Sequence, residues 1–198
     1  MKVCKFGGSS LADAFQIKKV CDIVFADEDR KVVVVSAPGK RNKEDIKVTD
    51  LLIAVAKARI SGNSYEKEIE AVIERFADIT NSLNITSILP EIENTLRTVA
   101  DADYSDDVKY LDSVKAMGED CCARLVASYL NSIGHKARYC NPKECGLFLK
   151  HNELGKAVIL GESYDNLSNL GKGDELCIFP GFYGRSNVNI NTITHCCI

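Results

Sequence analysis

The sequence of 198 residues lacks several features that mark particular protein classes. It has no tryptophan, only four prolines, and no apolar run near the ~20 residues that a membrane-spanning helix needs. Its start lacks the charged and apolar regions of a secretory signal. Its net charge of -3 lacks the basic excess of nucleic-acid-binding domains. We therefore expect a cytoplasmic protein that acts on small molecules, with neither nucleic acid nor membrane as a partner.

Paired metal-ligand spacing is also lacking, although cysteines are frequent. Nine are present, an odd number, and no two form a Cys-x-x-Cys pair. Cys140, Cys145, His195, Cys196 and Cys197 could in principle build a metal site, but their spacing is not that of a zinc knuckle. We predict mostly buried, reduced thiols and no metal-binding residues.

The first residues of the chain read as a short buried strand that runs directly into a glycine pair. Gly7 and Gly8 allow the backbone to turn with its N–H groups exposed, and either of the two serines that follow can cap a helix beginning near Leu11. An anion held there would meet unpaired amides, a positive helix end and the charge of Lys5. The alternative is an ordinary strand-to-helix turn with a surface lysine.

A second strand is predicted over residues 31–36, where four consecutive valines indicate a strand covered on both faces, as in a parallel sheet. The strand–helix–strand order implies a right-handed crossover, which places Ser36 beside the glycine pair at one edge of the sheet. Ligands of open α/β sheets bind along that edge. The fold class expected is α/β, a three-layer α/β/α sandwich around a mostly parallel sheet.

Hydrophobic periodicity and breaker residues place the remaining elements. Helices are expected over 11–25, 51–60, 64–79, 88–99, about 105–133 and 162–170, and strands over 137–140, 146–149, 157–160 and 175–179. The charged segment 40–47 is most simply a solvated loop. The last strand ends in Pro180-Gly181, a third junction between a strand and a glycine loop on the same edge.

A glycine–glutamate pair stands inside the longest predicted helix. Glycine costs ~1 kcal/mol relative to alanine within a helix, so Gly118 indicates a bend or a close backbone approach. Glu119 follows on the apolar side, where a carboxylate needs a partner. The alternative is a glutamate at the edge of the apolar face that reaches water.

The segment Lys5-Phe6-Gly7-Gly8-Ser9-Ser10 resembles the opening signature of aspartate kinases, a branch of the amino-acid kinase superfamily. Gly118-Glu119 resembles the family's Ser-x-Gly-Glu motif, although the serine is replaced by Ala116. The resemblance implies that the phosphates of ATP are held by Lys5, Gly7, Gly8 and Ser9, and the amino-acid substrate by Ser36, Thr49 and Glu119. Lys5 would also be catalytic. Thr49 is equally a plausible helix N-cap, which would explain a threonine there by itself.

The reaction implied by this resemblance is transfer of the terminal phosphate of ATP to the β-carboxylate of L-aspartate, in the pathway to lysine, threonine and methionine. Mg²⁺ follows from the reaction class and not from a visible ligand set. Two alternatives stay open. The chain could be a kinase for another amino acid, or an inert fragment that binds a ligand or a partner chain.

The resemblance covers residues 1–184, the amino-terminal, substrate-binding part of an amino-acid kinase domain, and residues 185–198 form a divergent tail. The family's Gly-Arg-Gly-Gly-Ser-Asp segment is missing from the tail. We therefore expect a kinase domain truncated at its C-terminus, from a shortened reading frame. An incomplete sheet would expose an edge, so a homo-oligomer is a further expectation. The period-two pattern of the tail permits either a hairpin strand or a loose end.

Overall fold

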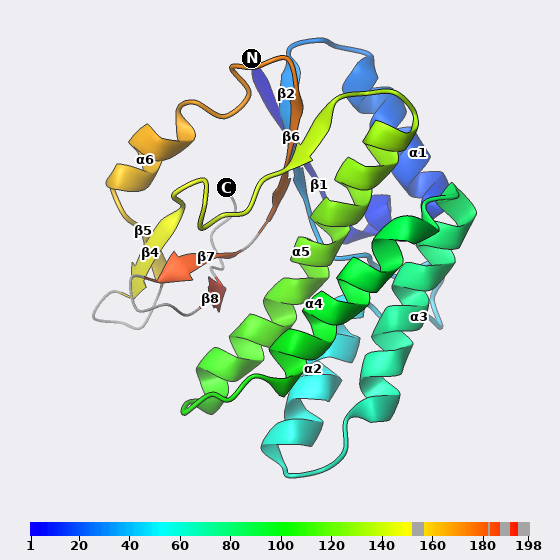
Figure 1. Cartoon of the computed structure of the whole chain (residues 1–198), viewed down its shortest axis with the longest axis vertical. Helices are drawn as coiled ribbons and strands as arrows, with labels where there is room; N and C mark the ends of the chain where they lie inside the picture. The colour runs from blue at the N-terminus through cyan, green and yellow to red at the C-terminus, as the bar shows by residue number, and fades with distance from the viewer. Residues whose placement is uncertain (152–156, 182, 187–190, 194–198) are drawn as a thin grey trace.

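A four-stranded parallel sheet, sheet A, lies at the centre of the structure (Figure 1). The structure is a computed structural model that describes residues 1–151, 157–181, 183–186 and 191–193. The strands of sheet A, in spatial order, are β1 (Lys2–Phe6), β2 (Arg30–Val35), β6 (Leu176–Pro180) and β3 (Ala137–Tyr139). All three pairings are parallel, which confirms the predicted fold class.

The valine run of β2 is buried from both sides. Val33 and Val35 belong to the larger hydrophobic core, which the helices build against one face of sheet A. Val32 and Val34 belong to a smaller cluster on the other face. Because successive side chains of a strand point to opposite faces, only an uninterrupted apolar run can fill both clusters.

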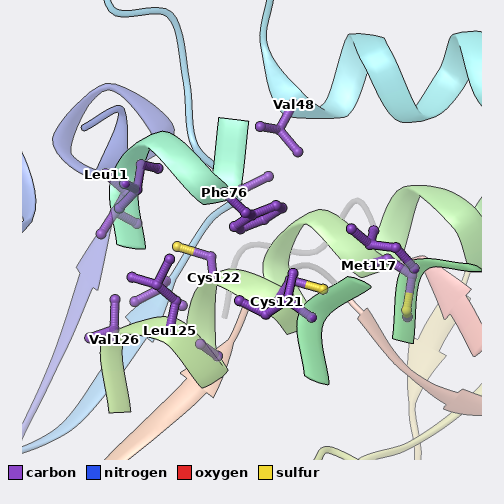
Figure 2. Packing of buried hydrophobic residues seen from close by; sticks show 14 of the residues in the cluster. Leu11, Val48, Phe76, Met117, Cys121, Cys122, Leu125 and Val126 are labelled. Atoms are coloured by element: carbon purple, nitrogen blue, oxygen red, sulfur yellow. The ribbon is translucent and has the colours of Figure 1, made fainter. Parts of the chain in front are cut away.

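The helices α1 to α5 gather on one side of sheet A in Figure 1. The helical elements are η1 (Gly8–Leu11), α1 (Ala14–Phe25), α2 (Val48–Ile60), α3 (Glu66–Leu83), η2 (Thr86–Ile88), α4 (Leu89–Asp101), α5 (Asp107–Ser132) and α6 (Glu162–Leu167). Figure 2 shows how Phe76 of α3 packs beside Cys121, Cys122 and Leu125 of α5. Helix α5 lies deepest, since most of its side chains between Tyr110 and Leu130 are buried.

A second sheet, sheet B, lies with α6 on the opposite side of sheet A (Figure 1). Its strands are β5 (Ala157–Ile159), β4 (Phe148–His151), β7 (Tyr183–Ser186) and β8 (Asn191–Ile193), in that spatial order. Among its described residues, β4 pairs with β7 in parallel, whereas β4 with β5 and β7 with β8 are antiparallel. Of the two outcomes open for the tail, residues 191–193 adopt the strand. Strand β7 spans the boundary predicted at residue 184, and that division stays a prediction.

The first helix begins later than predicted. Residues 8–11 form a 3-10 turn, and α1 starts at Ala14 because the carboxylate of Asp13 accepts a hydrogen bond from the Gln16 N–H at 2.9 Å. The N-cap position of the turn is occupied by Gly7, and no side-chain capping bond is made there. The prediction of a serine cap near Leu11 was therefore wrong, since an aspartate in extended conformation is a strong alternative cap.

Buried thiols were predicted correctly for most of the described cysteines. Cys21, Cys121, Cys122, Cys140 and Cys177 are buried, Cys4 and Cys145 are half-buried, and all seven are free of disulfides. His195, Cys196 and Cys197 lie outside the described residues. Within the described part of the chain, no helix combines the length and apolarity that crossing a membrane requires.

Candidate functional site

Three strand ends of sheet A meet at one edge, as the sequence predicted. Phe6 pairs with Val35, and Val35 pairs with Pro180. Beyond these residues the chain is still held together, because the Ser36 N–H donates to the Phe6 carbonyl at 3.2 Å and the Gly181 N–H donates to the Val35 carbonyl at 2.8 Å. Ser36 therefore lies next to the start of the glycine turn.

A cavity of about 470 Å³ opens at this edge. Its lining residues are Gly8, Ser9, Ser36, Ala37, Pro38, Gly39, Lys40, Lys47, Thr49 and Glu119. The volume falls within the range of small-molecule sites. The structure thus brings together most of the predicted phosphate-binding and substrate-binding residues, although they come from the β1–α1 turn, the loop after β2, helix α2 and helix α5.

Two of the predicted residues do not line the cavity. Gly7 precedes the 3-10 turn and has open space where a Cβ would stand. Lys5, in β1, is near enough to Glu119 for its ammonium group to favour the ionised carboxylate. Its charge therefore belongs to the electrostatics of the cavity even though its side chain is not part of the wall.

The cavity wall depends on a close backbone approach between Gly8 and Gly39. The Gly39 N–H donates to the Gly8 carbonyl at 2.8 Å. A Cβ on Gly39 would stand 2.6 Å from the Gly8 carbonyl carbon, and a Cβ on Gly8 would stand 2.8 Å from the Ala37 oxygen. Both contacts are with backbone, which cannot rotate away, so only glycine fits at either position without rearrangement.

Helix α2 directs its N-terminus at the cavity. Its N-cap residue is Lys47, which makes no side-chain capping bond, and Thr49 lies inside the first turn. The alternative interpretation of Thr49 as the N-cap is therefore wrong, and its place in the cavity wall remains. The helix end carries a partial positive charge, and with Lys40 and Lys47 it makes this side of the cavity favourable for an anion.

Glu119 reaches the cavity because Gly118 lets α5 approach the loop after β2. A Cβ on Gly118 would stand 2.8 Å from the Ala37 Cβ and 3.1 Å from Leu52 Cδ1. Of the two outcomes predicted for Gly118, the close approach is the one observed, within a continuous helix. The Ala37 N–H hydrogen-bonds to the Glu119 carboxylate.

Burial raises the pKa of Glu119 to about 8, because removal from water penalises the charged carboxylate more than the Ala37 N–H and the nearby Lys5 and Lys115 favour it. In the absence of ligand, Glu119 is therefore largely protonated at neutral pH. A cationic ligand group beside it would favour the ionised form.

The charged loop between Gly39 and Lys47 is anchored, whereas the sequence indicated a simple solvated excursion. Arg75, on α3 and only 5% exposed, donates to the carbonyls of Gly39 at 2.8 Å and Ala12 at 3.3 Å. It also forms an ion pair with Asp45. Arg41 binds the same carboxylate through its Nε at 3.0 Å.

Hydrogen bonds from Arg41, with further ones from Arg75, hold the pKa of Asp45 well below its usual range. The loop is thus clamped from within the fold. Sequence reasoning missed the residues that this loop contributes to the cavity wall, namely Ala37, Pro38, Gly39, Lys40 and Lys47. The usable signal was the Ser-Ala-Pro-Gly run at the end of a buried strand.

Next to Glu119, the carboxylate of Asp120 lies in a closed polar network on the other side of α5. Its Oδ1 accepts hydrogen bonds from the hydroxyls of Tyr183, at 2.5 Å, and Tyr139. Its Oδ2 accepts from the Arg124 Nε at 2.7 Å, and Arg124 also binds Glu91 at 2.6 Å. Asp120 is 3% exposed. The network ties α5 to β7, directly after the strand-end loop at Gly181.

The model of the "Amino acid kinase family" matches residues 1–195 of this chain. The chain belongs to the amino acid kinase family. Among members of this family, the chain is similar to Aspartokinase 3 of Bacillus subtilis (strain 168), with 52% identity over 187 residues that cover 94% of this chain and 41% of the relative. It is also similar to the chloroplastic Aspartokinase 1 of Arabidopsis thaliana, with 33% identity over 82% of this chain and 29% of that relative.

Solved structures of amino acid kinases share the fold. Aspartate kinase from Clostridium acetobutylicum superposes with a TM-score of 0.79 at 27% identity and covers 98% of this chain and 41% of its own. Aspartokinase III of E. coli, in complex with aspartate and ADP, gives a TM-score of 0.75 at 22% identity, over 96% of this chain and 42% of its own. The chain therefore spans less than half the length of these relatives.

Proposed function

We propose that this chain carries the amino-acid-binding and phosphate-binding part of an aspartate kinase, which transfers the terminal phosphate of ATP to the β-carboxylate of L-aspartate. The observation that carries the proposal is the cavity at the edge of sheet A, which combines the Gly8–Ser9 turn with Ser36, Thr49 and Glu119. The similarity to aspartokinases along 94% of the chain supports it.

The proposed roles follow from the chemistry of each group. Ser36 and Thr49 offer hydroxyls to the carboxylates of the amino acid. Glu119 is placed to bind its ammonium group, which would displace the proton that the buried carboxylate holds at neutral pH. A carboxylate nucleophile is already ionised, so catalysis would depend on positioning and charge neutralisation and not on a general base.

The phosphates of ATP fit the glycine turn. The space where a Cβ of Gly7 would stand is open, so a phosphate oxygen can approach the backbone amides of the turn there. We assign the phosphates to Lys5, Gly7, Gly8 and Ser9, with Lys5 neutralising charge on the transferred group. Mg²⁺ would come with the nucleotide phosphates. Magnesium use, a cytoplasmic location and a homo-oligomer remain predictions.

Calorimetric titration tests the proposal. L-aspartate should bind the chain in the presence of Mg-ATP, and L-glutamate, which is one methylene longer, should bind more weakly. Because Glu119 must lose its proton, aspartate binding at pH 7 should release protons, so the measured heat should depend on the ionisation enthalpy of the buffer. Failure of both amino acids to bind would contradict the proposed site. Tighter binding of glutamate would identify a kinase for another amino acid.

Lys5→Ala addresses the transfer step. It should abolish most phosphate transfer wherever the wild-type chain shows turnover with ATP and aspartate, and it should leave the fold intact by circular dichroism. An unchanged rate would remove Lys5 from the mechanism. Binding of both ligands without turnover by the wild-type chain would indicate that transfer needs residues beyond this chain.

A further inference from the structure

Three cysteine thiols lie together on the face of sheet A that is opposite the helical core. Cys140 and Cys177 are 1% and 2% exposed, and the half-buried Cys145 packs against the same cluster. The strand register explains the first pair. Arg138 of β3 lies opposite Cys177 of β6, and the Cys140 N–H then donates to the Ile178 carbonyl at 2.8 Å.

A tight turn brings the third thiol back toward the first. The Cys145 N–H donates to the Asn141 carbonyl at 2.9 Å, and the side chain of Asn141 accepts from the Lys143 N–H at 3.0 Å. Gly146 then takes a positive φ of 76°, which lets the chain leave the turn toward β4. In the resulting arrangement the Cys140 thiol donates to the Arg138 carbonyl at 3.8 Å and lies close enough to the thiols of Cys145 and Cys177 to interact with both.

Cys145 is the accessible member of this thiol cluster. It lines a surface cavity of about 610 Å³ whose charged lining residues are Arg138, Lys143, Glu144 and Asp165. The neighbouring Cys140 thiol lowers the pKa of the Cys145 thiol, and Arg138 acts in the same direction. Cys140 also lowers the pKa of the Cys177 thiol, so it is exposure that distinguishes Cys145 from the buried Cys177. Within the described ranges, no three His, Cys, Asp or Glu side chains are grouped so that they could hold a metal ion.

We propose that Cys145 and Cys140 form a dithiol site of oxidative modification, in which a hydroperoxide converts the pair to a disulfide. In the first step the Cys145 thiolate attacks the hydroperoxide, the O–O bond breaks, the alcohol leaves with a proton, and Cys145 becomes a sulfenic acid. In the second step the sulfur of Cys140 attacks that of Cys145, the S–O bond breaks and water leaves with the Cys140 proton. Two thiols thus supply the two electrons that reduce one peroxide.

The pattern of tryptic peptides makes this disulfide directly observable. Trypsin cuts after Arg138, Lys143 and Lys150, so Cys140 and Cys145 fall on different peptides. The native chain is treated with hydrogen peroxide near stoichiometry, the remaining thiols are alkylated, and the digest is analysed by mass spectrometry without reduction. We expect a species joining 139–143 to 144–150, two hydrogens lighter than the sum of the two peptides, which disappears after reduction.

Two variants complete the test. Cys145→Ser should remove the joined species and leave Cys140 alkylatable. The matched control is Cys4→Ser, which replaces a half-buried cysteine distant in sequence from Cys140 and Cys145, and it should leave the yield of the joined species unchanged. Recovery of Cys140 and Cys145 as free thiols in the wild-type chain, while Cys4 is oxidised, would overturn the proposal without reference to any variant. Joining of Cys140 to Cys177 in place of Cys145 would overturn the assignment of Cys145 as the reacting thiol.

Discussion

Glu119 and Asp120 are neighbours on α5, yet they meet opposite environments. Asp120 is almost fully buried, and each of its oxygens is matched by donors from Arg124, Tyr139 or Tyr183. Glu119 is half-buried at a cavity, and desolvation raises its pKa to about 8 although the Ala37 N–H favours the ionised form. One carboxylate is therefore satisfied by the fold, and the other is only partly satisfied.

This difference distinguishes a structural carboxylate from a ligand-binding one. A buried polar group that has all its partners contributes to stability, and removing one partner exposes the others to a large penalty. A carboxylate that desolvation keeps protonated is costly to the empty protein and gains a partner when a cation binds. Glu119 and Asp120 both carry a carboxylate, so the elements that surround each side chain determine its role.

The largest effect is expected from Asp120→Ala. The change would leave the guanidinium of Arg124 and two tyrosine hydroxyls without their shared acceptor, and it should lower the free energy of unfolding by about 3 to 5 kcal/mol. Urea denaturation measures it. The matched control is Asp112→Ala on the same helix, where a partly exposed pair with Lys115 is lost and about 1 kcal/mol or less is expected. Equal effects at both positions would break the comparison.

Gly8→Ala tests the surroundings of Glu119, the carboxylate at the cavity. The added Cβ would press on the carbonyl of Ala37, the residue whose N–H binds Glu119. We expect a loss of about 1 to 3 kcal/mol in unfolding free energy from overpacking, together with loss of nucleotide binding in calorimetry. Gly173→Ala is the control, since nothing lies within 4 Å of its Cβ position and it is not among the residues that line the cavity. A stable, fully binding Gly8→Ala variant would argue against the close approach.

The sequence predicted the cavity at the edge of sheet A better than the polar network around Asp120. A valine run and three strand-to-glycine junctions are local patterns, and parallel pairing then forces their ends together. Two partners of Asp120, Tyr139 on β3 and Tyr183 on β7, lie far from it along the chain, so no spacing rule connects them to it, whereas Arg124 stands at the i, i+4 spacing on the same helix. The clamp of Arg75 on the loop at Gly39 escaped for the same reason, because its partners are mainly backbone carbonyls of distant residues.

Tyr183→Phe tests how much one hydrogen-bond donor of Asp120 contributes to stability. It removes one donor from Asp120 but leaves Arg124 and Tyr139 in place, so the carboxylate keeps most of its partners. A hydrogen bond to a charged group contributes about 1.5 to 3 kcal/mol, and we expect a loss near the lower end because the remaining donors can adjust. The measurement is the midpoint of urea unfolding. A loss as large as that of Asp120→Ala would mean that Tyr183 alone accounts for the network.

At acidic pH and without ligand, the smallest effect on stability is expected from Glu119→Gln. The effect of this substitution should grow as the pH rises. The folded-state pKa of Glu119 is raised to about 8 from an ordinary 4.5, so the folded chain retains a proton that the unfolded chain has lost. This contribution to stability is fully present below pH 4.5 and is lost as the pH rises through 8. Glutamine cannot ionise and keeps its stability.

The melting temperature of the Glu119→Gln variant relative to the wild-type chain should therefore increase by a few degrees between pH 5 and pH 9. Glu28→Gln, at an exposed position, is the control and should show no such trend. In the presence of aspartate the order should reverse, because the wild-type carboxylate then has a cationic partner and the amide does not. A constant difference across this pH range would mean that Glu119 is ionised in the empty site, and the two neighbours on α5 would no longer differ in kind.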